Sequence, residues 1–233
     1  MLRDKTTMTV QEIGEQIHKQ GIFTGGPLEY FDQAGRLQLY TLVREGMSPY
    51  SKVLDIGCGC LRGGYWLVRL LDADCYCGIE PNEVMLQAGI DHCLTPELLT
   101  LKRPRFDNNS RFDFSVFGMQ FDVVVARSIW THASKKQIEV MLDNFVSGTS
   151  PHAFLLTSYL PAVWYRPWHG DYTGGGWVGK SHECKKAGLV NHRREWIDGE
   201  CRTRGLKLQQ LNDAPFNGQY WLKVTKLAAG ESV

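Results

Sequence analysis

The stretch VLDIGCGCLRGG, from Val53 to Gly64, decides how this chain folds. It begins with a short apolar run of the kind that a strand buried on both faces requires. Gly57 and Gly59 follow, and an apolar stretch from Tyr65 to Leu71 is typical of a helix. Such a strand, glycine turn and helix N-terminus let backbone amides and a helix dipole approach a ligand closely, because glycine has no side chain in the way.

A second apolar segment, Cys75 to Ile79, ends in Glu80. An acidic residue at the end of the second strand, roughly 20 residues past a glycine-rich turn, is suited to bind the hydroxyls of a ribose. The two features together predict a site for a nucleoside-containing cofactor.

Three motifs resemble those of the class I S-adenosylmethionine-dependent methyltransferases. They are VLDIGCGCLRGG, YCGIEPN at residues 76–82 and FDVVVARSIWTHAS at residues 121–134, and the likeness runs from about Ser51 to Ser158. The family often has a third glycine two residues after the second, where this chain has Leu61. The dinucleotide-binding signature G-x-G-x-x-G would need a glycine where Arg62 stands.

The resemblance implies an α/β fold, a Rossmann-like seven-stranded methyltransferase sandwich that is mostly parallel with one antiparallel strand. Residues 206–211 and 219–226 have the pattern of its last two strands. The resemblance also implies S-adenosylmethionine as the cofactor. The residues that it places around the cofactor are Asp55, Gly57, Gly59, Arg62, Glu80, Phe112, Asp113 and Arg127.

Several of these residues have a physical role that can be tested. A cation at a helix start is disfavoured unless an anion is near, so Arg62 is expected to be exposed and to bind the cofactor's carboxylate. In the family, the residues just before strand 121–126 flank adenine. Phe112 can pack on that ring and Asp113 can accept from its amine, although Asp113 can equally be an ordinary turn aspartate.

The proton acceptor has more than one candidate. Ligands of open α/β sheets bind beyond the carboxyl ends of the strands, which places Arg127, Ser128 and His132 near the reaction centre. His132 titrates near neutrality, as a general base should, but a histidine here can instead cap the next helix. His169 and Asp171 form the other candidate pair, and His182 with Glu183 comes after them.

The cysteine spacings differ from those of zinc ribbons. His182, Cys184 and His192 could ligate a metal, but no further tight cluster accompanies them, so no metal site is expected.

We expect residues 1–50 to form an N-terminal helical cap over the cofactor cleft and residues 51–233 to form the methyltransferase core. In the cap, Tyr30 or Phe31 either covers the bound ligand or packs against the domain. Residues near 159–191 are rich in aromatic residues and glycine, and a loop of this length is usually functional. We interpret it as a substrate lid, with a packed satellite core as the alternative.

Composition narrows the class of protein. The chain has 233 residues, 43% of them hydrophobic, and a net charge of +1, which argues against a nucleic-acid partner held by bulk charge. It has no apolar run of about 18 residues for a membrane span and no signal-peptide pattern at its start. Its seven cysteines are interpreted as reduced thiols of a cytoplasmic protein.

The sequence therefore predicts an enzyme that transfers a methyl group from S-adenosylmethionine to a small molecule, at oxygen. Two other functions stay open. A nicotinamide-dependent oxidoreductase would share the strand, turn and acid, but should have the third glycine and lack the C-terminal strand pair. A methyltransferase-like scaffold would bind the cofactor without turnover.

Overall fold

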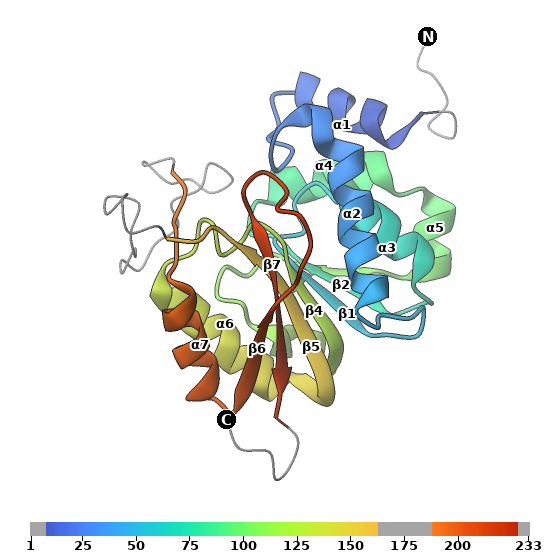
Figure 1. Cartoon of the computed structure of the whole chain (residues 1–233). Coiled ribbons are helices and arrows are strands. Elements are labelled where there is room, and N and C mark those ends of the chain that lie inside the picture. Colours follow the sequence, from blue (N-terminus) through green and yellow to red (C-terminus); the bar gives the residue numbers. More distant parts are fainter. Residues whose placement is uncertain (1–7, 163–187, 228–233) are drawn as a thin grey trace. The chain divides into compact units, whose positions relative to one another are not determined.

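The computed structural model describes residues 8–162 and 188–227 of the chain (Figure 1). Its internal contacts divide the chain into two compact units, Met1–Asn108 and Asn109–Val233, and each is described by itself. The expected lid contains residues 163–187, so most of it lies outside the described residues, with His169, Asp171, His182, Glu183 and Cys184.

The strands follow the order β3-β2-β1-β4-β5-β7-β6. In the first unit, β1 (Val53–Ile56), β2 (Tyr76–Ile79) and β3 (Arg105–Asp107) are parallel. In the second, β4 (Phe121–Ala126) pairs parallel with β5 (Thr149–Tyr159). The strand β7 (Tyr220–Lys226) runs antiparallel to both β5 and β6 (Leu206–Gln210). The seven-stranded fold with one antiparallel strand is confirmed.

Side-chain caps mark the start of several helices of the first unit. Thr9 and Glu12 form a capping box at the start of α1 (Val10–Lys19), and Asn82 caps α4 (Glu83–Cys93). Between them in sequence lie the 3-10 helix η2 (Leu28–Tyr30), α2 (Phe31–Arg44) and α3 (Gly64–Leu70). In Figure 1, α1 lies beside α4 and the start of α2.

One helix of this unit was missed. The segment from Leu94 to Asn109 lacks clear periodicity, and Pro96 and Pro104 predict breaks in it. The structure has α5 (Pro96–Lys102) there, with the Thr95 side chain accepting a hydrogen bond from the Leu98 N–H. Proline is favoured at the first helical position because its missing N–H would have no helical partner there.

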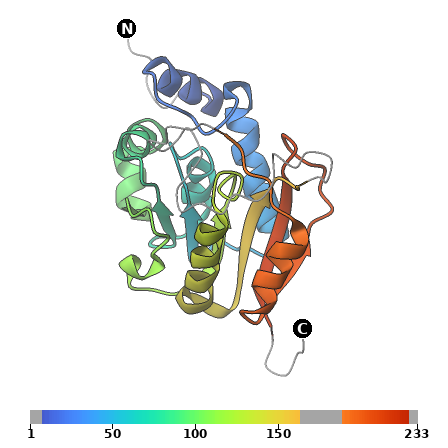
Figure 2. The same cartoon turned by 90° about the vertical axis from the view of Figure 1, so that its left-hand side faces the viewer.

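The second unit places its helices against β4 to β7. The 3-10 helix η3 (Phe114–Phe117) precedes β4, and α6 (Lys135–Gly148) begins at the expected Ser134–Gln137 capping box. The helix α7 (Arg194–Arg202) lies beside α6 on one face of the strands (Figure 2). An ion pair between Arg204 and Asp143 joins the ends of these helical segments. Within the described residues, no helix is both long and apolar enough to cross a bilayer.

Candidate cofactor-binding site

The glycine turn after β1 has a distinctive backbone. Gly57, Gly59 and Leu61 all have positive φ, of 68°, 57° and 61°. Leu61 thus keeps the left-handed conformation that the family's third glycine would favour, although this costs a leucine roughly 1–2 kcal/mol. Its side chain is fully buried, and its Cδ2 lies 2.9 Å from where a β-carbon on Gly64 would be. Packing of the side chain holds the strained backbone in place.

Glu80 is bound to this turn. It follows β2 directly, and its side chain is 2% exposed. Oε2 accepts a hydrogen bond of 3.1 Å from the Gly59 N–H, and Oε1 accepts one of 2.8 Å from the Asn82 N–H. Burial raises the pKa of Glu80 to about 7, while these two hydrogen bonds act to lower it. A carboxylate has about four acceptor positions, so this one can still accept from two hydroxyls.

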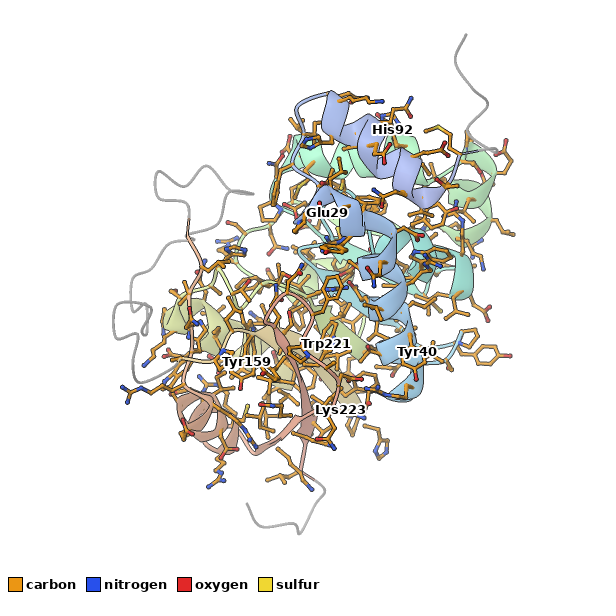
Figure 3. The ribbon with its side chains drawn as sticks, turned by 45° about the horizontal axis from the view of Figure 1, so that its top comes forward. Glu29, Tyr40, His92, Tyr159, Trp221 and Lys223 are labelled. Atoms are coloured by element: carbon orange, nitrogen blue, oxygen red, sulfur yellow. The ribbon has the colours of Figure 1, made fainter. Side chains whose placement is uncertain are left out.

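A cavity of about 530 Å³ lies in the same unit. It is lined by residues that follow α1, by residues along α4 and by Asn108, whose Nδ2 donates to the Glu80 carbonyl at 2.7 Å. On its wall the side chains of Gln20 and His92 are in contact at 3.0 Å, and Figure 3 shows His92. Asn108 thus connects the backbone of Glu80 to an open space beside α4.

Asp55 is the acid within β1, and it is almost fully buried. The Tyr76 hydroxyl donates to its Oδ2 at 3.0 Å. Burial raises the pKa of Asp55 to about 7; the Tyr76 hydrogen bond and the Arg62 charge act to lower it, and the Glu80 charge to raise it. The two carboxyl groups of the site are therefore both poised to titrate near neutral pH.

Arg62 is not exposed, so that expectation was wrong. The residue is half-buried, and burial is the main cause that lowers the pKa of its guanidinium. The N-terminal segment covers it, since a β-carbon on Gly26 would lie 3.3 Å from its Nη1. A β-carbon on Gly35 would lie 2.3 Å from the Arg62 carbonyl oxygen, so glycine lets α2 approach the turn. The Arg62 guanidinium therefore lies beneath the N-terminal segment, while the backbone of Arg62 belongs to the glycine turn.

Of the two cap aromatics, Phe31 packs in the core. It is fully buried and so close to α1 that a β-carbon on Gly14 would lie 2.4 Å from its ring. Tyr30 is 36% exposed, and of the two it alone retains surface that a ligand can contact.

The second unit contains the other residues expected around the cofactor. Phe112 is buried and has a positive φ of 54°. Asp113 begins η3, and its Oδ1 accepts from the backbone N–H and the hydroxyl of Ser115, at 2.9 and 2.6 Å. These hydrogen bonds lower the pKa of Asp113, so it is a capping residue as well as a candidate for binding adenine.

His132 is half-buried after β4. Its Nδ1 lies 3.0 Å from the Gly188 carbonyl oxygen, which can only accept, so Nδ1 carries the proton and Nε2 is the acceptor of the neutral ring. Burial lowers the pKa of His132, while that carbonyl acts to raise it. The ring is thus neutral at pH 7, with one lone pair that can accept a proton.

A polar network beside Arg127 was not predicted. The Ser128 N–H donates to Ser158 Oγ at 2.7 Å. Both serine hydroxyls donate to Oε1 of Gln219, at 2.9 Å from Ser128 and 2.7 Å from Ser158. The sequence Asn217-Gly218 indicates a hairpin turn just before Gln219. It does not predict which residues the Gln219 side chain contacts.

Arg127 packs over aromatic rings of the same region. Its guanidinium carbon is 5.0 Å from the centre of the Phe216 ring and 5.7 Å from that of Trp221. In the described part of the chain, no group of three or more His, Cys, Asp or Glu residues is arranged to hold a metal ion.

The strand order, the antiparallel β7 and the glycine turn together define the fold of the class I S-adenosylmethionine-dependent methyltransferases. No known family profile and no curated protein sequence matches the chain. Among solved structures, it is similar to magnesium protoporphyrin IX methyltransferase (ChlM) from Synechocystis PCC 6803 with bound SAM, with a TM-score of 0.62 and 15% identity over 97% of this chain and 99% of that chain.

Two further structures have the same fold. The DhpI–SAH complex has a TM-score of 0.63 and 13% identity, and covers 93% of this chain and 94% of that chain. DesVI of Streptomyces venezuelae has a TM-score of 0.61 and 13% identity, and covers 94% of this chain and 99% of that chain. At these identities the likeness establishes the fold alone.

Proposed function

We propose that this chain is an enzyme that transfers a methyl group from S-adenosylmethionine to an oxygen atom of a small molecule. The observation that carries the proposal is the Glu80 carboxylate, which the Gly59 and Asn82 N–H groups hold at the carboxyl end of β2. A fixed, buried carboxylate with acceptor positions to spare fits the two hydroxyls of a ribose.

The similar solved structures support the cofactor. ChlM was crystallised with SAM and with SAH, and DhpI with SAH, on a fold that this chain shares. In this chain, Asp55, the backbone of Gly57 and Gly59, and Glu80 would hold the cofactor, with Arg62 binding its carboxylate. Phe112, Asp113 and Arg127 are the proposed contacts from the second unit.

The reaction needs positioning and proton removal more than covalent catalysis. The cofactor supplies a methyl group that its sulfonium charge already activates. An acceptor hydroxyl that takes up this methyl group would have to give its proton to a residue of this chain, and S-adenosylhomocysteine would be the other product. We assign proton removal to Nε2 of His132, because Nδ1 is already a donor to Gly188. His169 and Asp171 remain the alternative pair.

We also propose an organisation for the chain. Residues 1–50 act as a cap, which is supported by Gly26 beside the Arg62 guanidinium. Residues 51–233 act as the catalytic core, and residues near 159–191 as its substrate lid. We further propose that the protein works in small-molecule metabolism without a nucleic-acid or membrane partner. A cytoplasmic location is supported by the six described cysteines, which are all free thiols.

The nicotinamide alternative is disfavoured by one observation. A dehydrogenase of this type was expected to lack the C-terminal strand pair, and here β7 pairs antiparallel with both β5 and β6. Calorimetric titration with S-adenosylmethionine and with NAD tests this directly. We expect binding of the first and none of the second, and the reverse result would overturn the cofactor assignment.

Turnover is tested separately from binding. The protein is incubated with methyl-radiolabelled S-adenosylmethionine and a small-molecule metabolite extract, and the labelled products are separated. We expect a labelled methyl ether or ester whose yield is strongly reduced when Glu80→Ala protein is used. Cofactor binding without any labelled product would instead identify a scaffold, and a labelled amine would correct the acceptor atom.

A further inference from the structure

Among the described residues, the side chain of Gln219 is held by its oxygen alone. Oε1 accepts hydrogen bonds from the hydroxyls of Ser128 and Ser158, and Ser158 is only 3% exposed. The Ser158 Oγ in turn accepts from the Ser128 N–H, so the hydroxyl proton of Ser158 is directed toward Gln219. The amide oxygen is therefore fixed, and the amide nitrogen must face away from both serines.

The backbone of Gln219 is equally well fixed. Phe216 and Gln219 exchange two backbone hydrogen bonds, of 3.2 and 3.1 Å, around Asn217 and Gly218. These two central residues have φ of 52° and 72°, as a two-residue hairpin turn of the I′ type requires. Arg127 packs over Phe216 and Trp221 on either side of this turn. Figure 3 shows Trp221 on β7 and Tyr159 on the neighbouring strand β5.

The network stands where ligands bind in this type of sheet. Ser128 lies just beyond the carboxyl end of β4, Ser158 is near that of β5, and Gln219 precedes the antiparallel β7. Ser128 has a φ of 59°, which is rare for a residue that is not glycine. Such strained backbone is concentrated at functional sites, where surrounding contacts hold it. Here the contacts are those with Ser158 and Gln219.

The amide nitrogen of Gln219 can donate hydrogen bonds to a ligand. Nε2 carries two N–H groups, and among the described residues neither donates to a protein acceptor. Gln219 is half-buried, and its Nε2 is not among the buried polar atoms that lack a partner in the described part of the chain, so these donors are within reach of a ligand. A neutral, pre-oriented pair of N–H groups is suited to a carbonyl or carboxylate oxygen.

We propose that Gln219 determines which methyl acceptors are used, by donating from Nε2 to a carbonyl or carboxylate oxygen of the acceptor. This rests on the proposed methyl transfer, and it narrows the substrate class to hydroxy acids and hydroxy-carbonyl compounds. Ser128 and Ser158 fix the orientation of the Gln219 amide, and the amide N–H groups select acceptors that have a carbonyl or carboxylate oxygen.

Two substitutions separate this role from a structural one. In Gln219→Glu, one carboxylate oxygen can still accept from both serines, but the other replaces the donors with an acceptor. In Gln219→Met, both the serine contacts and the donors are lost. The probes are 4-hydroxybenzoate and 4-hydroxyacetophenone against 4-ethylphenol, and 3-hydroxybutyrate against 2-pentanol, because the members of each set differ in the carbonyl or carboxylate group.

The measurement is a ligand-observed NMR titration of each probe into protein saturated with S-adenosylhomocysteine. We expect wild-type protein to bind the oxygen-bearing member of each set at least tenfold more tightly. Gln219→Glu should abolish that preference while binding 4-ethylphenol within about twofold of wild type and keeping its melting temperature. Gln219→Met should also lose the preference.

Three results would overturn the assignment. They are no preference in wild-type protein, including no binding of any probe; a preference retained in Gln219→Glu; and a preference retained in Gln219→Met. A preference retained in Gln219→Met with a lower melting temperature would make the network purely structural. Calorimetric binding of S-adenosylhomocysteine to the same samples tests the proposed function alone. If it binds while the preference is absent, only the role of Gln219 fails.

Discussion

The Gly59 N–H donates to Glu80 Oε2 over 3.1 Å, and this hydrogen bond joins the glycine turn after β1 to the end of β2. The residues are 21 positions apart, and each belongs to a motif that indicates the cofactor. The bond fixes the direction of the carboxylate before any ligand arrives, so little side-chain entropy remains to be lost on binding.

Glu80→Ala should weaken S-adenosylmethionine binding at least tenfold in a calorimetric titration. Two charge-assisted hydrogen bonds to the ribose would be lost, each worth roughly 1.5–3 kcal/mol. Glu97→Ala, the same change at an exposed position in the first turn of α5, is the control and should bind as wild type does. A loss below twofold in Glu80→Ala would contradict the ribose assignment.

Arg62→Met should weaken S-adenosylmethionine more than a decarboxylated analogue, because only the first has the carboxylate that the guanidinium is proposed to bind. Arg62→Lys keeps the charge and should recover part of the difference. Titration of both ligands into the three proteins provides the measurement. Equal losses for the two ligands would mean that Arg62 only supports the turn and the cap segment.

Leu61→Gly should be more stable than Leu61→Ala in chemical denaturation, by roughly 1 kcal/mol. Both variants lose a fully buried side chain, but only glycine adopts the left-handed backbone without strain. Both should be less stable than wild type by about 2 kcal/mol or more, owing to the cavity. If alanine proves the more stable of the two, the backbone at this position is not left-handed in solution.

Asp55→Asn should stabilise the ligand-free protein at pH 8 and change little at pH 4. Burial raises the pKa of Asp55 in the folded protein from 3.8 to about 7. The contribution of Asp55 to the free energy of unfolding is therefore fully present below about pH 4, where the carboxyl is protonated. It is lost as the pH rises through 7 and the buried carboxyl ionises.

An asparagine stays neutral at every pH and can still accept from Tyr76, so the gain at pH 8 should be on the order of 2 kcal/mol. Denaturation curves at several pH values measure it, with the exposed Asp72→Asn as the control. The same gain at pH 4 and pH 8 would show that Asp55 does not titrate in this range.

His132→Gln should lower kcat about 100-fold with an acceptor found in the labelling screen, and leave cofactor affinity unchanged. The acid limb of the pH–rate profile should also disappear, because protonation of the imidazole no longer switches off the base. His152→Gln, at an exposed position of β5, is the control. Wild-type kcat with a lower melting temperature would assign His132 to the structural role of holding residue 188.

The sequence by itself determined the features that depend on neighbouring residues. The buried runs of β1 and β4, the capping boxes of α1 and α6 and the acid after β2 are all visible within a few positions of one another. These local signals, with the resemblance to a family, were enough for the seven-stranded fold. The helix α5 was missed because Pro96 signals either a break or a first turn, and local sequence does not decide between them.

Only the tertiary structure decided the surroundings of the site. Arg62 is half-buried because residues 25–26 pass over it, and Leu61 keeps a glycine-like backbone because its side chain is packed into the core. Gln219 meets Ser158 and Ser128 across 61 and 91 residues of sequence. Periodicity and capping rules cannot predict contacts between residues so far apart in sequence. Such contacts arise only when β4, β5 and the turn before β7 pack together.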